Sequence, residues 1–170
     1  MTDLKKQNRK LAANGSFRGL SLLQHSAQVA AVIKAHEART LLDYGSGAGD
    51  AYRDPYNVHQ AWGVKRMSIY LYDPSFNPFR TPPAPGVKFD GVICSDVLEH
   101  IPADQVDALV QSLFNHARKF VWASVCCRPA KKLFPNGTNP HVTIRPLQWW
   151  HDVFIEHMPQ GVDFYLTETP

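Results

Sequence analysis

The chain has 170 residues, of which 44% are hydrophobic and 19% charged, and its formal net charge is +3. This length suits one domain with a buried core, and the composition excludes a disordered tail, collagen and a coiled coil. Much of the positive charge lies in Lys5, Lys6, Arg9 and Lys10, so it argues only weakly for nucleic acid as a partner. We expect a single domain over 1–170, with a flexible basic terminus over residues 1–15.

The first half of the chain predicts one helix and three strands. Apolar residues recur at helical spacing over 22–36, and Ser21 could cap this helix. Short β-prone runs over 40–44, 68–72 and 89–95 predict strands, and glycines stop the first of them abruptly. The third run is apolar enough to be buried on both faces of a sheet.

The second half continues the alternation of helices and strands. Apolar residues at i, i+3, i+4 and i+7 predict a helix over 103–117, with Pro102 in its first turn. A strand over 120–125, a helix over 147–157 and a strand over 162–167 follow. Strands that alternate with helices through short connections predict an α/β fold with a mostly parallel sheet covered on both faces.

A glycine turn over residues 45–49 directly follows the first predicted strand. Gly45, Gly47 and Gly49 would let the backbone approach a ligand closely, although a tight turn that needs positive φ would explain the same glycines. Asp43 precedes the turn, and no Lys followed by Ser or Thr comes after it, which disfavours nucleoside triphosphate binding. The turn therefore predicts a site for another nucleotide-like cofactor.

A second acidic residue, Asp73, ends the strand over 68–72. At this position a carboxylate can accept hydrogen bonds from both hydroxyls of a ribose. The alternative is an ordinary aspartate that initiates a turn before Pro74. Together with Asp43 and the glycine turn, Asp73 favours cofactor binding.

Three segments, taken in order, resemble the class I S-adenosylmethionine-dependent methyltransferases. Residues 41–50 look like the first motif of that family, 70–75 resemble its acidic ribose-binding strand end, and 89–102 are similar to the strand and loop of many small-molecule methyltransferases. The likeness covers roughly residues 38–126. It implies a Rossmann-like sheet, S-adenosylmethionine as cofactor and methyl transfer as the reaction.

The resemblance also implies which residues hold the cofactor. Asp43 and the glycine turn would hold the methionine moiety, Asp73 the ribose, and Ser95 to Val97 the edge nearest the acceptor. The implied cofactor site consists of Asp43, Tyr44, Gly45, Ser46, Gly47, Asp73, Pro74, Ser95, Asp96 and Val97.

The chain departs from the family in two places. Only fifteen residues separate Asp73 from Phe89, and residues 74–85 contain five prolines, where the family usually places a helix and another strand. We therefore expect a sheet that is reduced between the second and fourth family strands, with the loop over 76–87 on the adenine side. Only three residues follow Thr167, so we also expect an incomplete terminal hairpin.

Methyl transfer is an in-line displacement that requires positioning and exclusion of water but no metal. A hydroxyl or amine acceptor would benefit from a base. His100, after the strand over 89–95, is the first candidate, and His141, in the loop after the strand over 120–125, is the second. Either histidine could instead be a structural residue bonded to the backbone.

Asp43 and Asp73 are thirty residues apart, whereas about 20 is usual for a β-α-β dinucleotide unit, and the inserted segment over 52–66 leaves the glycine turn directly. We expect it to close over the acceptor, with Tyr56, His59 and Trp62 binding the substrate. The alternative is that these aromatic residues pack as a satellite core.

These features predict methyl transfer from S-adenosylmethionine to a small-molecule or sugar-like acceptor. The alternative is a catalytically silent cofactor-binding or interaction protein with the same fold; nicotinamide-dependent reduction is disfavoured because the dinucleotide fingerprint lacks its final glycine. Cys94, Cys126 and Cys127 lack the spacing of a redox pair or zinc knuckle, and no apolar run of about 18 residues is present. We expect a cytoplasmic protein with reduced thiols, without a metal site or a membrane partner.

Overall fold

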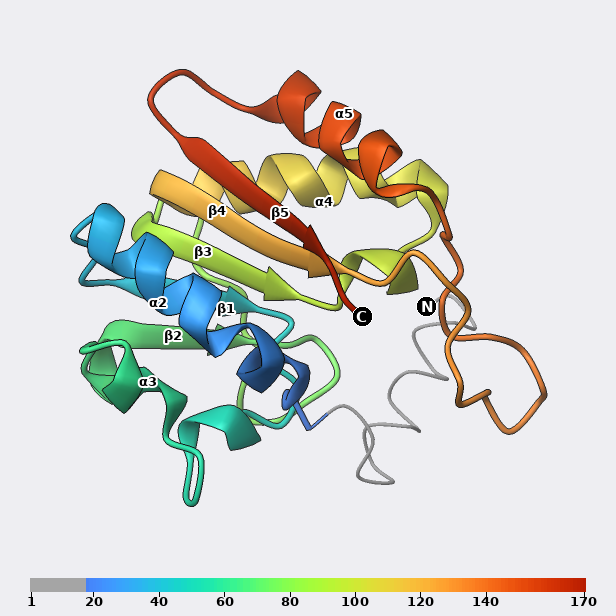
Figure 1. Ribbon diagram of the computed structural model, residues 1–170, viewed down its shortest axis with the longest axis horizontal. Coiled ribbons are helices and arrows are strands. Elements are labelled where there is room, and N and C mark those ends of the chain that lie inside the picture. Colours follow the sequence, from blue (N-terminus) through green and yellow to red (C-terminus); the bar gives the residue numbers. More distant parts are fainter. Residues whose placement is uncertain (1–17) are drawn as a thin grey trace.

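Within residues 18–170, which the computed structural model describes, five parallel strands form one sheet in the order β2-β1-β3-β4-β5 (Figure 1). The expected basic terminus over 1–15 lies outside the described residues. The α/β class and the parallel sheet are confirmed. The strands are β1 (Leu41–Tyr44), β2 (Ile69–Tyr72), β3 (Phe89–Ser95), β4 (Ala117–Val125) and β5 (Asp163–Glu168).

Helices cover both faces of this sheet (Figure 1). One face carries a 3-10 turn η1 (Ser21–His25), α2 (Ser26–Ala35) and the short α3 (Val58–Ala61), and the other carries α4 (Ala103–His116) and α5 (Leu147–His157). Three further 3-10 turns, η2 (Asp50–Tyr52), η3 (Arg66–Ser68) and η4 (Leu98–His100), lie in the connections.

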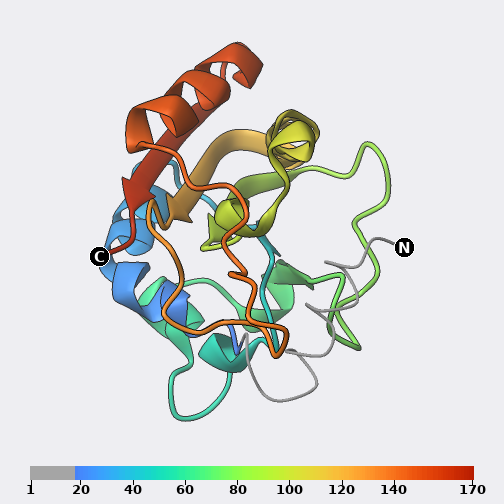
Figure 2. The same cartoon turned by 90° about the vertical axis from the view of Figure 1, so that its right-hand side faces the viewer.

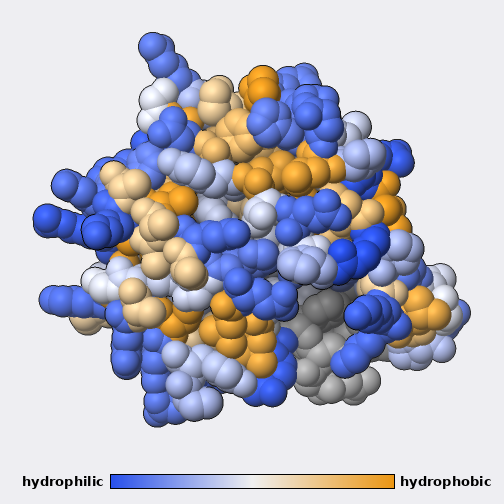
Figure 3. All heavy atoms as spheres, viewed as in Figure 1, coloured by the Kyte–Doolittle hydropathy of each residue, from blue (hydrophilic) through white to orange (hydrophobic). Residues whose placement is uncertain are grey.

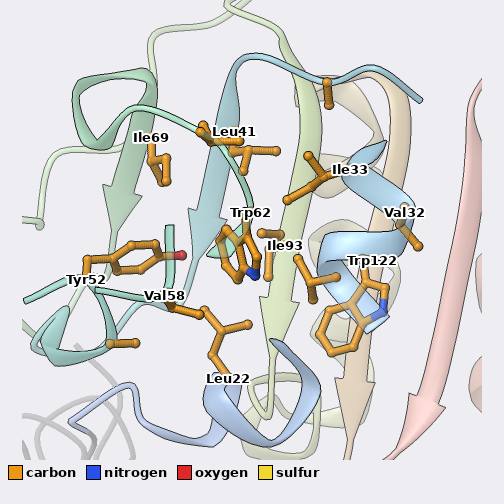
Figure 4. Close-up of a cluster of buried hydrophobic side chains, with 14 of the residues drawn as sticks. Leu22, Val32, Ile33, Leu41, Tyr52, Val58, Trp62, Ile69, Ile93 and Trp122 are labelled. Carbon is orange, nitrogen blue, oxygen red and sulfur yellow. The ribbon is translucent and has the colours of Figure 1, made fainter. Parts of the chain in front are cut away.

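The central strands β1, β3 and β4 are largely buried on both faces because successive side chains alternate between two cores. Leu41 and Ile93 point into the core beneath α2, whereas Leu42 and Val92 pack in the core beneath α4 and α5. Figure 4 shows the first of these cores, in which Trp62 lies among side chains from the sheet and from α2. This double burial explains why the third strand reads as a continuous apolar run.

Two details differ from the sequence-based expectations. Strand β4 begins at Ala117, three residues before the expected start, because this buried residue pairs with Phe89 of β3. Ser21 does not cap a helix with its side chain. It begins η1, and its Oγ lies 3.5 Å from Oγ of Ser95.

The proline-rich connection between β2 and β3 contains no helix or strand, as expected, and the structure describes it in full. The backbone N–H of Asp73 donates to the carbonyl oxygen of Phe79 at 2.9 Å. The ring of Phe79 packs against the core beneath α2. The loop therefore folds back onto the end of β2 in place of the absent elements.

The carboxyl ends of all five strands lie at one edge of the sheet, which faces the viewer in Figure 2. The long connection from β4 to α5 crosses this edge (Figure 2). Figure 3 shows apolar and hydrophilic side chains interspersed over the face seen in Figure 1. Among the described helices, none has the length and apolar character needed to cross a membrane.

Candidate functional site

The glycine turn follows β1 and is hydrogen-bonded to the end of β2. The N–H groups of Gly45 and Ser46 both donate to the carbonyl oxygen of Tyr72, at 2.7 and 3.1 Å. Gly45 has a φ of +90°, and a Cβ there would lie 2.2 Å from Cγ2 of Val97. Glycine is therefore required at this position both for its backbone conformation and for the close approach of Val97.

Asp73 is directed back toward this turn. Its Oδ2 accepts the N–H of Gly47 at 2.9 Å, and its Oδ1 accepts the N–H of Ser75 at 2.8 Å. Burial raises the pKa of Asp73, and the two N–H groups oppose that shift. A carboxylate offers about four acceptor positions, so these bonds leave capacity for ribose hydroxyls. Pro74, the next residue, is exposed.

Asp43 lies at the end of β1 and is 3% exposed. The hydroxyl group of Tyr52 donates to its Oδ2 at 2.9 Å. Burial raises the pKa of Asp43 to about 7; the hydrogen bond from Tyr52 opposes this shift, and the charge of Asp73 adds to it. A cationic ligand group beside Asp43 would favour the ionised carboxylate.

Ser46 provides a direct test of whether the turn suits a polar ligand. Its Oγ atom is buried and has no hydrogen-bond partner among the described residues. Such a group is costly to leave unpaired, and a polar cofactor atom would satisfy it. The side chain of Tyr44 is instead part of an aromatic contact, because its ring packs edge-on against that of Tyr72 with centroids 4.8 Å apart. The groups of the turn that a polar ligand could bond are therefore Oγ of Ser46 and the backbone.

The residues after β3 are fixed by β4 and by the end of the chain. The Oγ atoms of Ser95 and Ser124 lie 3.1 Å apart. Asp96 has a φ of +53°, and its Oδ1 accepts the hydroxyl groups of Ser124, at 2.7 Å, and of Thr169. These hydroxyl groups hold Asp96 at the carboxyl edge, next to Val97, which contacts the glycine turn.

The two histidines that the sequence suggested as bases lie side by side. The rings of His100 and His141 are nearly perpendicular, with centroids 4.9 Å apart. Nδ1 of His100 lies 3.0 Å from the carbonyl oxygen of Pro140, and Nδ1 of His141 lies 2.7 Å from that of Arg128. Carbonyl oxygens only accept hydrogen bonds, so each Nδ1 carries a proton. Burial, together with His141, lowers the pKa of His100 to about 4.

Glu99 lies next to this pair and is fully buried. Its Oε1 accepts the N–H of Cys126 at 3.1 Å. Burial raises the pKa of Glu99 to about 8, and the charge of Asp96 adds to the shift. From the sequence we expected no role at the site for Glu99 or Cys126. The signal was their position, since Cys126 directly follows β4 and Glu99 lies in η4, four residues after the end of β3.

The segment over 52–66 separates into core and surface residues. Trp62 is 6% exposed, lies in the core beneath α2, and donates its indole N–H to the backbone oxygen of Ser26 at 3.1 Å. His59 lies over Tyr52, with ring centroids 6.5 Å apart. Tyr56 is 41% exposed. The satellite-core alternative therefore describes Trp62, whereas Tyr56 presents its ring to solvent.

Comparison with known proteins shows to which family the chain belongs. A family model described as a methyltransferase domain matches residues 9–168. No curated protein matches the chain, and no solved structure matches it. Because the family match spans almost the whole chain, the chain belongs to this methyltransferase family and is a methyltransferase.

Proposed function

We propose that this methyltransferase uses S-adenosylmethionine and that its acceptor is a small molecule or a sugar-like compound. The observation that carries the proposal is the convergence of Asp43, Asp73 and the glycine turn, in which Asp73 accepts the N–H of Gly47. Two carboxylates on adjacent parallel strands suit a ligand that carries an ammonium group and a ribose diol.

The residues present would divide the cofactor between them. The carboxylate of Asp43 would accept from the methionine ammonium group, Asp73 from the ribose hydroxyls, and Oγ of Ser46 would bond a polar atom within the turn. Ser95, Asp96 and Val97 would border the sulfonium side. When bound, S-adenosylmethionine supplies an electrophilic methyl group, and the protein positions an acceptor atom in line with it.

We assign His100 as the residue that takes the proton from the acceptor. A pKa of about 4 leaves its imidazole uncharged at neutral pH but makes it a weak base, so the proton of a hydroxyl or amine acceptor would pass to it as the methyl group is transferred and not beforehand. The hydrogen bond to Pro140 fixes the orientation of the ring. His141 is the second candidate, and Tyr56 and His59 would contact the acceptor from the segment over 52–66.

Binding of S-adenosylhomocysteine, measured by calorimetry on the full chain, tests the cofactor. We expect saturable binding that weakens about 10- to 100-fold in Asp73→Asn, which keeps an acceptor for Gly47 but removes the charge. Asp104→Asn, on the exposed surface of α4, is the matched control and should bind normally. No binding by the wild type at millimolar ligand would refute the proposal.

Turnover tests the acceptor class. Labelled S-adenosylmethionine is incubated with panels of hydroxyl, amine, thiol and sugar compounds, and we expect label in at least one small molecule. If the protein binds S-adenosylhomocysteine but labels only macromolecules, the small-molecule acceptor is wrong. If it binds and labels nothing, the protein is a silent cofactor binder.

A further inference from the structure

Three potential metal ligands converge at the carboxyl ends of β3 and β4. Glu99 lies in η4 after β3, Cys126 directly follows β4, and His141 lies in the connection to α5. One ligand atom from each residue lies within 4.8 Å of the other two. The sheet order brings these distant segments together, because β3 and β4 are neighbours in the sheet.

Glu99 supplies an unsatisfied oxygen at this point. Its Oε1 accepts the N–H of Cys126, whereas its Oε2 is buried and has no hydrogen-bond partner within residues 18–170. A buried carboxyl oxygen without a partner is costly in free energy. Either a proton or a cation would be needed to compensate it.

His141 is oriented as a metal ligand. Because its Nδ1–H donates to the carbonyl oxygen of Arg128, the lone pair of the neutral ring is on Nε2. Nε2 lies 4.0 Å from Oε1 of Glu99. Histidines that bind metals almost always donate their other ring N–H to a carbonyl or carboxylate, which fixes the tautomer and the ring orientation.

The donor set indicates which cations would bind. One carboxylate oxygen, one imidazole nitrogen and one thiolate sulfur suit Zn²⁺ and its neighbours in the transition series, and not Mg²⁺ or Ca²⁺. Tetrahedral zinc with bonds of about 2.0–2.3 Å separates its ligands by roughly 3.5 Å. The three ligand atoms, which lie within 4.8 Å of one another, would therefore have to move about 1 Å closer together around the ion.

We propose that Glu99, Cys126 and His141 form a binding site for a zinc-class divalent cation, beside the cofactor site and distinct from it. This contradicts our expectation from the sequence that the chain has no metal site. Three protein ligands leave one position of a tetrahedral ion open, as in catalytic zinc sites. Binding replaces the thiol proton of Cys126 and any proton on Glu99, and both protons are released to solvent. His141 is then a ligand of the metal, and His100 is the candidate base.

Cobalt(II) provides a direct probe, because a cobalt–thiolate bond gives a charge-transfer absorption band that oxygen and nitrogen ligands do not give. The full chain is stripped with a chelator and titrated with Co²⁺, and Zn²⁺ affinity is then measured by competition. The variants are Cys126→Ser and His141→Gln. Cys127→Ser and His157→Gln are the matched controls, because neither residue belongs to the cluster.

We expect one Co²⁺ per chain with a charge-transfer band that is lost in Cys126→Ser and kept in Cys127→Ser. Zn²⁺ affinity should fall at least about tenfold in both ligand variants, since even substitution of residues behind a ligand costs this much. Thermal unfolding of the metal-free variants checks that they fold. Absence of the band in the wild type, or its persistence in Cys126→Ser, would overturn the proposal and leave a protonated Glu99 beside His141.

Discussion

The hydroxyl group of Tyr52 donates a hydrogen bond of 2.9 Å to Oδ2 of Asp43. Tyr52 is itself buried, and Trp62 packs edge-on against its ring with centroids 6.0 Å apart. This contact ties the segment over 52–66 to the carboxylate at the end of β1. A change in this segment can therefore alter the candidate cofactor site without a substitution in the glycine turn.

Substitution of Tyr52 by Phe should remove this bond and keep the ring. We expect a loss of about 1–3 kcal/mol in the free energy of unfolding at pH 8, where Asp43 is ionised, because hydrogen bonds to charged groups contribute about that much. At pH 5 the carboxyl group is protonated, and the loss should be smaller. Urea unfolding at both pH values measures it, with Tyr56→Phe as the control. An equal loss at both pH values would contradict the assigned ionisation of Asp43.

The stability of the metal-free protein should fall as pH rises from about 5 to 8.5. Burial raises the pKa of Asp43 to about 7 and that of Glu99 to about 8, above the roughly 4 expected in the unfolded chain. The folded state therefore binds more protons than the unfolded state in this range. The stabilisation that these protons contribute is complete below about pH 4 and is lost as the pH passes through the folded pKa values.

Urea unfolding across this pH range should show the decline, and Asp43→Asn and Glu99→Gln should each flatten it. Asp104→Asn should leave the slope unchanged, since that residue is exposed. A wild-type stability that rises between pH 6.5 and 8.5, above the range in which the lowered pKa of His100 contributes, would show that the two carboxyl groups are ionised and stabilised in the fold.

Gly45 and Gly86 have similar backbone conformations but different surroundings, with φ values of +90° and +82°. A Cβ at Gly86 would meet nothing within 4 Å, whereas one at Gly45 would collide with Val97. Gly86→Ala should cost about 1–2 kcal/mol from backbone strain alone. Gly45→Ala should cost about 1–3 kcal/mol more, from overpacking, and should also weaken binding of S-adenosylhomocysteine.

The collision can be isolated in a double-mutant cycle. In the background of Val97→Ala, the additional cost of Gly45→Ala should shrink toward that of Gly86→Ala, as chemical denaturation would show. If the cost of Gly45→Ala is the same in both backgrounds, Val97 is not what requires glycine in the turn.

Tyr56 and Trp62 should respond differently to substitution by alanine. Trp62→Ala should cost about 3–5 kcal/mol in the free energy of unfolding, because its side chain fills the core beneath α2. Tyr56→Ala should change stability by less than about 0.5 kcal/mol, because its side chain is exposed.

With an acceptor identified by the panel, Tyr56→Ala should raise the acceptor KM and leave the affinity for S-adenosylhomocysteine within a few fold. His59→Ala, assayed in parallel, should do the same. Kinetics that change only in proportion to lost stability would assign the segment to packing and remove it from the acceptor site.

The candidate cofactor site was partly readable from the sequence because its signals are local. The glycines of 45–49 follow a strand directly, and Asp73 ends the next one, so chain order places them at one sheet edge in a parallel α/β fold. The local sequence pattern could not show that Asp73 accepts hydrogen bonds from the N–H groups of Gly47 and Ser75. These bonds make Asp73 a support of the glycine turn as well as a candidate residue for binding the cofactor.

The sequence by itself determined the α/β class, the alternation of the elements and the absence of a helix in the connection from β2 to β3. Apolar periodicity, glycines and prolines act over a few residues, so they can be read without knowledge of the fold. Only the tertiary structure decided that Trp62 is a core residue and that Glu99, Cys126 and His141 meet. Burial and contact between distant segments depend on the order of the strands, and local sequence does not specify that order.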